Sequence, residues 1–130
     1  MRLLSVLLVV LGTILPLQAQ RDTDAAITDL LAKGDAAGLS VHFNEHVEIV
    51  LNTTNDVYSR NQASGILADF FKKNKVVAYQ VLHKGSKENS AFTIGSLRTA
   101  TGNFRVYILI RRTTGERPLI QQLRIESSND

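Results

Sequence analysis

The stretch SRNQASGILADFFKK, residues 59–73, decides the fold of this chain. It opens with a capping box, in which the side chains of Ser59 and Gln62 each accept a hydrogen bond from the other's backbone N–H at the start of a helix. Apolar residues then recur at intervals of three and four, which places them on one face of that helix. They are Ala63, Ile66, Leu67, Phe70 and Phe71. A helix with this face needs an apolar surface to pack against.

That surface is expected from the second half of the chain, where apolar and polar residues alternate. A period of two predicts four strands, at residues 76–84, 90–100, 104–112 and 118–126. The short polar turns between them fit hairpins, so the sequence predicts an antiparallel meander. The predicted register pairs Ile110 with Ile94 and Leu119, and Val106 with Arg98 and Leu123. Its inner face is expected to carry Val77, Tyr79, Val81, Phe92, Ile94, Val106, Ile108, Ile110, Leu119, Leu123 and Ile125.

Two helices and a hairpin are predicted before the capped helix. The first helix runs from Asp22 or Thr23 to Gly34, and the second, capped by Asp35, buries Leu39 and Phe43 and stops near Asn44. Residues 47–51 then form a strand, and residues 57–58 pair back after a turn at 52–56. The predicted fold class is α+β. Three N-terminal helices pack on a curved antiparallel four-stranded meander, accompanied by a short two-stranded hairpin.

The first 19 residues have the pattern of a secretory signal peptide. Arg2 supplies a positive charge, an apolar run extends from Leu3 to Leu17, and a small residue, Ala19, precedes Gln20. The run is shorter than the roughly 20 apolar residues that span a bilayer, and it contains a proline. We therefore expect cleavage after Ala19, no membrane span, and a single domain over residues 20–130 in the periplasm or outside the cell.

Composition restricts the partners of this domain. The net charge is +3 for the whole chain and only +2 for residues 20–130, which does not argue for nucleic acid, and the chain has no cysteine for a disulfide or a lipid anchor. The charges are unevenly placed, however. Residues 20–70 contain three Lys or Arg against eight Asp or Glu, whereas residues 71–130 contain eleven against four. An acidic and a basic end bear on the choice and orientation of partners.

Four stretches resemble a family of short exported bacterial proteins known only as a domain of unknown function. They are GDA (residues 34–36), VYSR (57–60), ILADFF (66–71) and GNFRV (102–106). The order of the elements is similar to that of the nuclear-transport-factor-2-like, or cystatin-like, cone. This resemblance implies a curved sheet that wraps the capped helix around a pocket, and often a dimer. Isomerases, dehydratases and binding modules share the superfold, so the resemblance does not decide the function.

Catalytic signals are weak. HFNEH, residues 42–46, reads H-x-x-E-H, but a zinc peptidase needs both histidines on one face of a continuous helix, and here the pair straddles a helix–strand boundary. Isomerases that share the superfold resemble one another in a carboxylate base inside the cone. The predicted inner face has no Asp or Glu before Glu126, which leaves His83 as the candidate for acid–base chemistry. We expect no catalytic residue, no metal and no cofactor.

A ligand site is expected where polar side chains interrupt the inner face. In the predicted register Tyr79 faces Ser96, Arg98 lies one step along, and Gln121 shares the face. A few converging polar groups in an apolar cavity are typical of a small-molecule site. The alternative interpretation places Arg98 at a wet edge and Tyr79 in the core. The predicted function is that of an exported, non-catalytic binding or interaction domain. The sequence does not name its ligand, and a small apolar molecule in the cone pocket is one candidate. The alternatives are an isomerase or hydrolase using His83, or a purely structural dimer.

The outer face of the predicted sheet is expected to be partly apolar. Its large apolar side chains are Leu82, Leu97, Tyr107, Leu109 and Ile120, and the predicted register makes most of them contiguous. Monomers rarely leave a large contiguous apolar patch in water, and a two-fold axis lets one patch bury its own copy. The sequence therefore predicts a sheet-to-sheet homodimer through Leu97, Tyr107, Leu109 and Ile120.

Overall fold

A computed structural model describes residues 21–52, 54–113 and 115–129. The predicted signal peptide and its cleavage site lie outside these residues. Within them, no helix is long and apolar enough to cross a membrane. The first helix contains residues 21–33 and ends at Gly34, whose φ of +64° is the left-handed conformation that closes a helix. Asp35 then caps α2 (Ala36–Ser40) by accepting a hydrogen bond from the Gly38 N–H at 2.9 Å.

The predicted capped helix is α3 (Arg60–Lys73), and both bonds of the capping box between Ser59 and Gln62 are present. The strands are β1 (Phe43–Leu51), β2 (Thr54–Ser59), β3 (Val76–Lys87), β4 (Ser90–Thr99), β5 (Gly102–Arg111) and β6 (Leu119–Ser128). Five of the six strands are longer than predicted, and β4 is one residue shorter. The predicted order of helices and strands is therefore confirmed.

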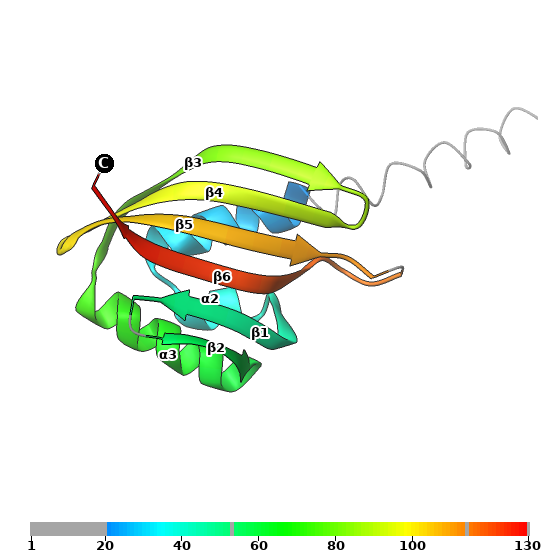
Figure 1. The fold of residues 1–130 in the computed structure, drawn as a ribbon, viewed down its shortest axis with the longest axis horizontal. Coiled ribbons are helices and arrows are strands. Elements are labelled where there is room, and N and C mark those ends of the chain that lie inside the picture. The colour runs from blue at the N-terminus through cyan, green and yellow to red at the C-terminus, as the bar shows by residue number, and fades with distance from the viewer. Residues whose placement is uncertain (1–20, 53, 114, 130) are drawn as a thin grey trace, which may run out of the picture.

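All six strands form one mixed sheet in the order β2-β1-β6-β5-β4-β3. The hairpin of β1 and β2 was predicted beside the meander, but β1 joins it by pairing parallel to β6, with Ile49 opposite Leu123. The other neighbouring strands are antiparallel. The described helices lie together on one side of the curved sheet (Figure 1). The opposite face of the sheet therefore carries no described helix.

The core lies between the helices and the inner face of the sheet. Its largest fully buried side chains are Leu31, Leu39, Phe43, Val47, Ile49, Leu67, Leu97, Val106, Ile108, Ile120, Leu123 and Ile125. Every described helix and the four strands β1, β4, β5 and β6 contribute to this set. Burying apolar surface is the main favourable term in folding, so these contacts hold the layers together.

The second helix is shorter than predicted. Phe43 was expected on this helix, but it is the first residue of β1 and is completely buried there. The carbonyl of His42 accepts a hydrogen bond of 2.7 Å from the N–H of Ile120 in β6. Pairing with β6 therefore ends α2 at Ser40, although the local sequence pattern predicts a helix that continues to about Asn44.

The predicted register between β4 and β5 is wrong by three residues. Ile94 lies opposite Tyr107 and not Ile110, and the turn contains only Ala100 and Thr101. The Thr99 hydroxyl fixes this tight turn, because it donates to the Gly102 carbonyl and accepts from the Thr101 N–H. An odd shift turns every side chain of a strand to the other face. Hence Phe92 and Ile94 lie on the outer face, and Leu97 is completely buried on the inner one.

Two bulges explain the remaining differences from the predicted faces. Between Leu109 and Ile110 the register with β6 shifts, so that Ile110 lies opposite Ile120 and not Leu119, and Ile120 is completely buried. A second irregularity between Val76 and Ala78 leaves Val77 59% exposed instead of on the inner face. An extra residue in one strand redirects the side chains on either side of it. Leu97 and Ile120, both predicted on the outer face, are thus core residues.

Candidate functional site

A pocket of about 370 Å³ opens between α3, the tip of the β1–β2 hairpin and the start of β5. It lies on the helical side of the sheet, at the end of the cone where α3 finishes. Its walls are mainly apolar and its rim is polar. The lining residues are Leu51, Asn52, Thr54, Tyr58, Ile66, Asp69, Phe70, Lys73, Asn74 and Phe104.

One face of α3 supplies both the core and the wall of this pocket. Leu67 and Phe71, four residues apart, are buried against the sheet. Ile66 and Phe70, also four residues apart, are only partly buried and line the pocket. Residues at i and i+4 lie above one another on a helix, so the apolar stripe consists of two parallel rows. The sequence predicted both rows as core, because periodicity alone does not separate a filled interior from a pocket wall.

Aromatic rings form the inner end of the pocket. The ring of Phe70 meets that of Phe104 edge to face, with 5.2 Å between centroids and 77° between planes. It meets Phe71 in a similar arrangement at 5.7 Å and 71°. Edge-to-face pairs of this kind are favourable because the positive ring edge contacts the negative ring face. Phe70 is therefore held from two sides while part of its surface remains toward the pocket.

The polar groups of the pocket already have protein partners. The hydroxyl of Tyr58 shares a hydrogen bond with that of Thr54, four residues earlier on the same strand, β2. The Asn74 side chain donates to the Phe70 carbonyl at 2.9 Å and accepts from the Thr101 hydroxyl. These bonds tie the end of α3 to the β4–β5 turn and fix the pocket entrance. The sequence signal for this role is an Asn directly after the last helical turn, which apolar periodicity does not detect.

Charge is confined to the rim of the pocket. Asp69 is the one carboxylate among the lining residues, and Lys73, one helical turn further on, pairs with it at 3.0 Å. Both side chains are more than 60% exposed. An exposed ion pair of this type contributes little to stability, and a solvated, paired carboxylate is a poor general base. The one carboxylate of the pocket lining is therefore solvated and paired with a lysine.

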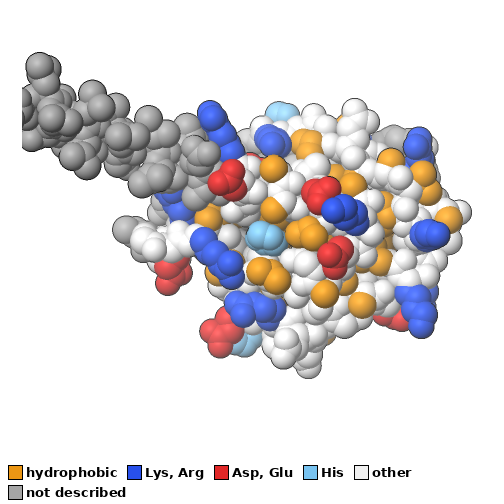
Figure 2. All heavy atoms as spheres, turned by 180° about the vertical axis from the view of Figure 1, so that it is seen from behind, with side chains coloured by type: hydrophobic (Ala, Val, Ile, Leu, Met, Phe, Trp, Pro, Cys, Tyr) orange, Lys and Arg blue, Asp and Glu red, His pale blue; other side chains and the backbone are white. Residues whose placement is uncertain are grey.

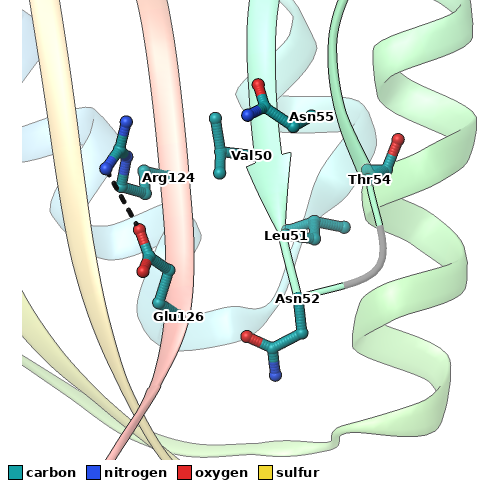
Figure 3. Close-up of a pocket in the computed structure, with 7 residues that line it drawn as sticks. All are labelled: Val50, Leu51, Asn52, Thr54, Asn55, Arg124 and Glu126. Carbon is teal, nitrogen blue, oxygen red and sulfur yellow. Dashed lines mark ion pairs between the residues drawn. The ribbon is translucent and has the colours of Figure 1, made fainter.

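A second, wider cavity of about 590 Å³ lies beside the hairpin tip, and Leu51, Asn52 and Thr54 line both cavities. Arg124 and Glu126 form an ion pair of 3.3 Å along β6 within it (Figure 3). Its lining is more polar than apolar, and its charges neutralise each other. Buried apolar surface is what drives the binding of most small ligands, so the smaller pocket is the better candidate.

The four residues predicted to bind a ligand are not brought together. Tyr79 lies opposite Leu97 on the inner face, whereas Ser96 and the exposed Arg98 lie on the outer face. Gln121 occupies the bulge of β6, where its side-chain oxygen is 3.4 Å from the Asn44 amide nitrogen. The shift in register between β4 and β5 separates them, because it moves Ser96 and Arg98 to the opposite side of the sheet from Tyr79.

Tyr79 occupies an unusual position on that inner face. A side chain at Gly95 would put its Cβ 2.2 Å from the Tyr79 hydroxyl, so the Tyr79 ring covers the glycine. Burial raises the pKa of Tyr79 to about 12. Its hydroxyl is buried and has no hydrogen-bond partner among the described residues. The space next to it, bordered by Thr28, Thr93 and the Asp24–Lys84 ion pair, is about 10 Å³, which is too small for an organic ligand.

The histidines do not assemble a catalytic or metal site. His83 is exposed on the outer side of β3, with its ring 5.7 Å from that of Phe92. His46 lies within β1 and His42 in the turn before it, so the H-x-x-E-H pattern is not helical. Burial, with a smaller effect of Arg117, lowers the pKa of His42. Among the residues that the structure describes, no group of three His, Cys, Asp or Glu could hold a metal ion.

Comparisons with known proteins agree with this architecture. Residues 25–126 match the family model described as Domain of unknown function (DUF4783). A DUF4783 family protein from Bacteroides ovatus is 31% identical, with a TM-score of 0.77 over 82% of this chain and 96% of the other. One from Bacteroides fragilis is 37% identical, with a TM-score of 0.74 over 79% and 96%. No curated protein matches.

The fold extends beyond these relatives. A domain of unknown function with a cystatin-like fold from Nostoc punctiforme has a TM-score of 0.67 at 12% identity, over 88% of this chain and 78% of the other. At this identity the likeness concerns the fold alone. The predicted resemblance to a cystatin-like cone and to a family of unknown function is confirmed.

Proposed function

The chain belongs to the DUF4783 family, and we propose that its domain is a non-catalytic binding module that holds a small, mainly apolar molecule in the pocket between α3 and the β1–β2 hairpin. The observation that carries this proposal is the second apolar row of α3, Ile66 and Phe70, which packs against the core and leaves part of its surface facing the pocket. Apolar side chains next to a cavity gain by contact with an apolar ligand, because that contact removes both surfaces from water.

The dimensions and chemistry of the pocket support a small ligand. Its volume of about 370 Å³ lies near the lower end of the roughly 300–1,000 Å³ that is usual for ligand sites. Polar side chains, Tyr58 and Asn52, line the pocket at the hairpin, and Phe70 and Phe104 are its aromatic lining residues. A ligand with an apolar body and one polar end matches this arrangement. Export by the predicted signal peptide would put this binding outside the cytoplasm.

The test replaces a residue of the pocket wall with a larger one, so that its side chain occupies the pocket. Ile66→Trp puts an indole into the space, whereas Ala68→Trp adds the same ring to an exposed position of the same helix. The probe is 1-anilinonaphthalene-8-sulfonate, titrated by fluorescence, with native mass spectrometry of the wild-type protein purified from its own host as the second readout. We expect Ile66→Trp to weaken probe binding at least tenfold, about 1.4 kcal/mol, and Ala68→Trp to leave it within a factor of two.

Thermal unfolding accompanies each titration, so that loss of the fold is distinguished from loss of the pocket. Phe70→Leu provides a second variant, since it enlarges the cavity and is expected to change the affinity without blocking entry. The proposal is overturned if folded Ile66→Trp binds the probe as tightly as the wild type does.

A further inference from the structure

The outer face of the sheet carries a second candidate binding surface, which the shifted register creates. Phe92 and Ile94 on β4 lie next to Leu109 and Tyr107 on β5. His83 of β3 lies beside Ile94 and 5.7 Å from the Phe92 ring. We call these five residues the outer platform. No described helix covers it, because all of them lie behind the sheet (Figure 1).

The rings of the outer platform are held in place by the strands beneath them. A Cβ at Gly85 would lie 2.3 Å from a ring carbon of Phe92, so this ring rests across the glycine backbone. An aromatic ring over a cross-strand glycine is a known device for fixing a curved sheet. The Tyr107 ring is within 22° of parallel to Phe92, at 6.3 Å between centroids. The two rings are therefore nearly parallel and stacked across the neighbouring strands β4 and β5.

Cations flank the outer platform on both sides along the strands. Arg105 lies opposite Ser96 and Arg98 opposite Asn103 beyond one end, and Arg111 opposite Ser90 beyond the other. Arg124, next to Tyr107, is paired with Glu126 at 3.3 Å. A second carboxylate on this face, Glu48, accepts a hydrogen bond of 2.9 Å from Gln122. These charges sum to a positive surface, whereas the helical face mixes acidic and basic side chains around hydrophobic ones (Figure 2).

We propose that the outer platform binds an anionic polysaccharide, whose sugar rings lie on Phe92 and Tyr107 and whose carboxylates meet the exposed Arg98 and Arg111. The C–H face of a sugar ring is attracted to the negative face of an aromatic ring. The guanidinium group suits a carboxylate because it offers two parallel donors. Sugar hydroxyls can also donate to Glu48 and Glu126, which lie on the same face. This site is independent of the pocket beside α3.

Charge and shape favour an anionic polysaccharide over a second copy of the chain, a peptide or single-stranded nucleic acid. A two-fold sheet-to-sheet dimer would bring the arginine-rich face against itself, which opposes the homodimer predicted from the sequence. A peptide bound by a sheet usually adds a strand to an edge, and four of the five platform residues lie on β4 and β5, which are paired on both sides; only His83 lies on the edge strand β3. Single-stranded nucleic acid also stacks on aromatic rings, but its phosphates would face Glu48 and Glu126 without hydroxyl donors to match them.

The test titrates the full chain by calorimetry with three ligands: decagalacturonate, its neutral methyl ester and single-stranded (dT)10. The binding variants are Tyr107→Ala and Arg98→Gln. The matched controls are Val41→Ala, an exposed apolar residue after α2, and Lys33→Gln, a cation of the first helix paired with Asp29. We expect the wild type to bind the uronate at least tenfold more tightly than the ester. Each binding variant should lose about tenfold, and each control less than twofold.

Four results would each overturn the proposal. They are no uronate binding by the wild type, equal binding of the ester, tighter binding of (dT)10, or a wild-type dimer in sedimentation equilibrium that Tyr107→Ala dissociates. Circular dichroism checks that each variant is folded. Ile66→Trp, which fills the pocket beside α3, should bind uronate as the wild type does, so the two binding proposals succeed or fail separately.

Discussion

Truncation of Leu97 to alanine tests the register of the sheet directly. Leu97 is completely buried between Tyr79 on β3 and Phe104 on β5. Removing a buried leucine side chain costs the lost transfer free energy and leaves a cavity, together about 3 kcal/mol or more. The total stability of a domain of this size is about 5–15 kcal/mol, so the variant should lose a large part of it. In the register predicted from sequence, Leu97 would lie on the outer face and its truncation would cost far less.

The measurement is urea unfolding followed by circular dichroism, with the free energy extrapolated to water and the slope compared between variants. Leu82→Ala is the matched control, because Leu82 is 49% exposed and surface substitutions usually change stability by less than about 0.5 kcal/mol. The reasoning fails if Leu97→Ala costs less than about 1 kcal/mol, or if the two variants lose equal amounts. Either result would return Leu97 to the outer face and restore the predicted pairing of Ile94 with Ile110.

Three further predictions concern individual polar groups. Tyr79→Phe should leave the free energy of unfolding unchanged or raise it, by up to about 1 kcal/mol in chemical denaturation, because it removes a buried hydroxyl without a partner among the described residues. Asn74→Ala should lower that free energy by about 1–2 kcal/mol, because it removes side-chain bonds to Phe70 and Thr101. No measurable loss would show that these bonds do not stabilise the junction between α3 and the β4–β5 turn. Burial lowers the pKa of His42, so its contribution to stability is complete above the unfolded pKa of about 6.5 and is lost as the pH falls toward the folded pKa. His42→Gln should therefore flatten the decline in stability between about pH 7.5 and 5.5, and an unchanged decline would show that other groups cause it.

The order of the elements could be predicted from the sequence because its signals are local. The capping box at Ser59, the glycine that ends the first helix and the period of two after residue 75 each act within a few residues, and the structure contains all of the corresponding elements. The end of the second helix could not be predicted in this way. The pairing of His42 with Ile120 joins residues that are far apart in the chain, and it overrides the helical pattern that continues through Phe43.

The alternation of apolar and polar residues does not determine which side of each strand faces the core, because that also depends on the turns between the strands. A three-residue turn around Gly102 and the observed two-residue turn before it both fit the composition of residues 99–103. The choice between them depends on the Thr99 hydroxyl, which bonds the backbone of the turn. This one side chain decides whether Leu97 or Phe92 faces the core. The predicted ligand site and the predicted dimer face both used the wrong side of β4. The shift moves Ser96 and Arg98 away from Tyr79 and moves Leu97 into the core, whereas the bulge between β5 and β6 buries Ile120.

The distribution of apolar residues on α3 explains why the pocket could not be predicted either. A helix that packs on a curved sheet touches it along one row of side chains, and the next row stands over the place where the sheet bends away. Leu67 and Phe71 form the first row, and Ile66 and Phe70 the second. Both rows are equally apolar in the sequence, and only the path of β1, β2 and β5 around the helix makes one of them a pocket wall. The row of Leu67 and Phe71 is buried, whereas the row of Ile66 and Phe70 packs against the same core and keeps part of its surface on the pocket.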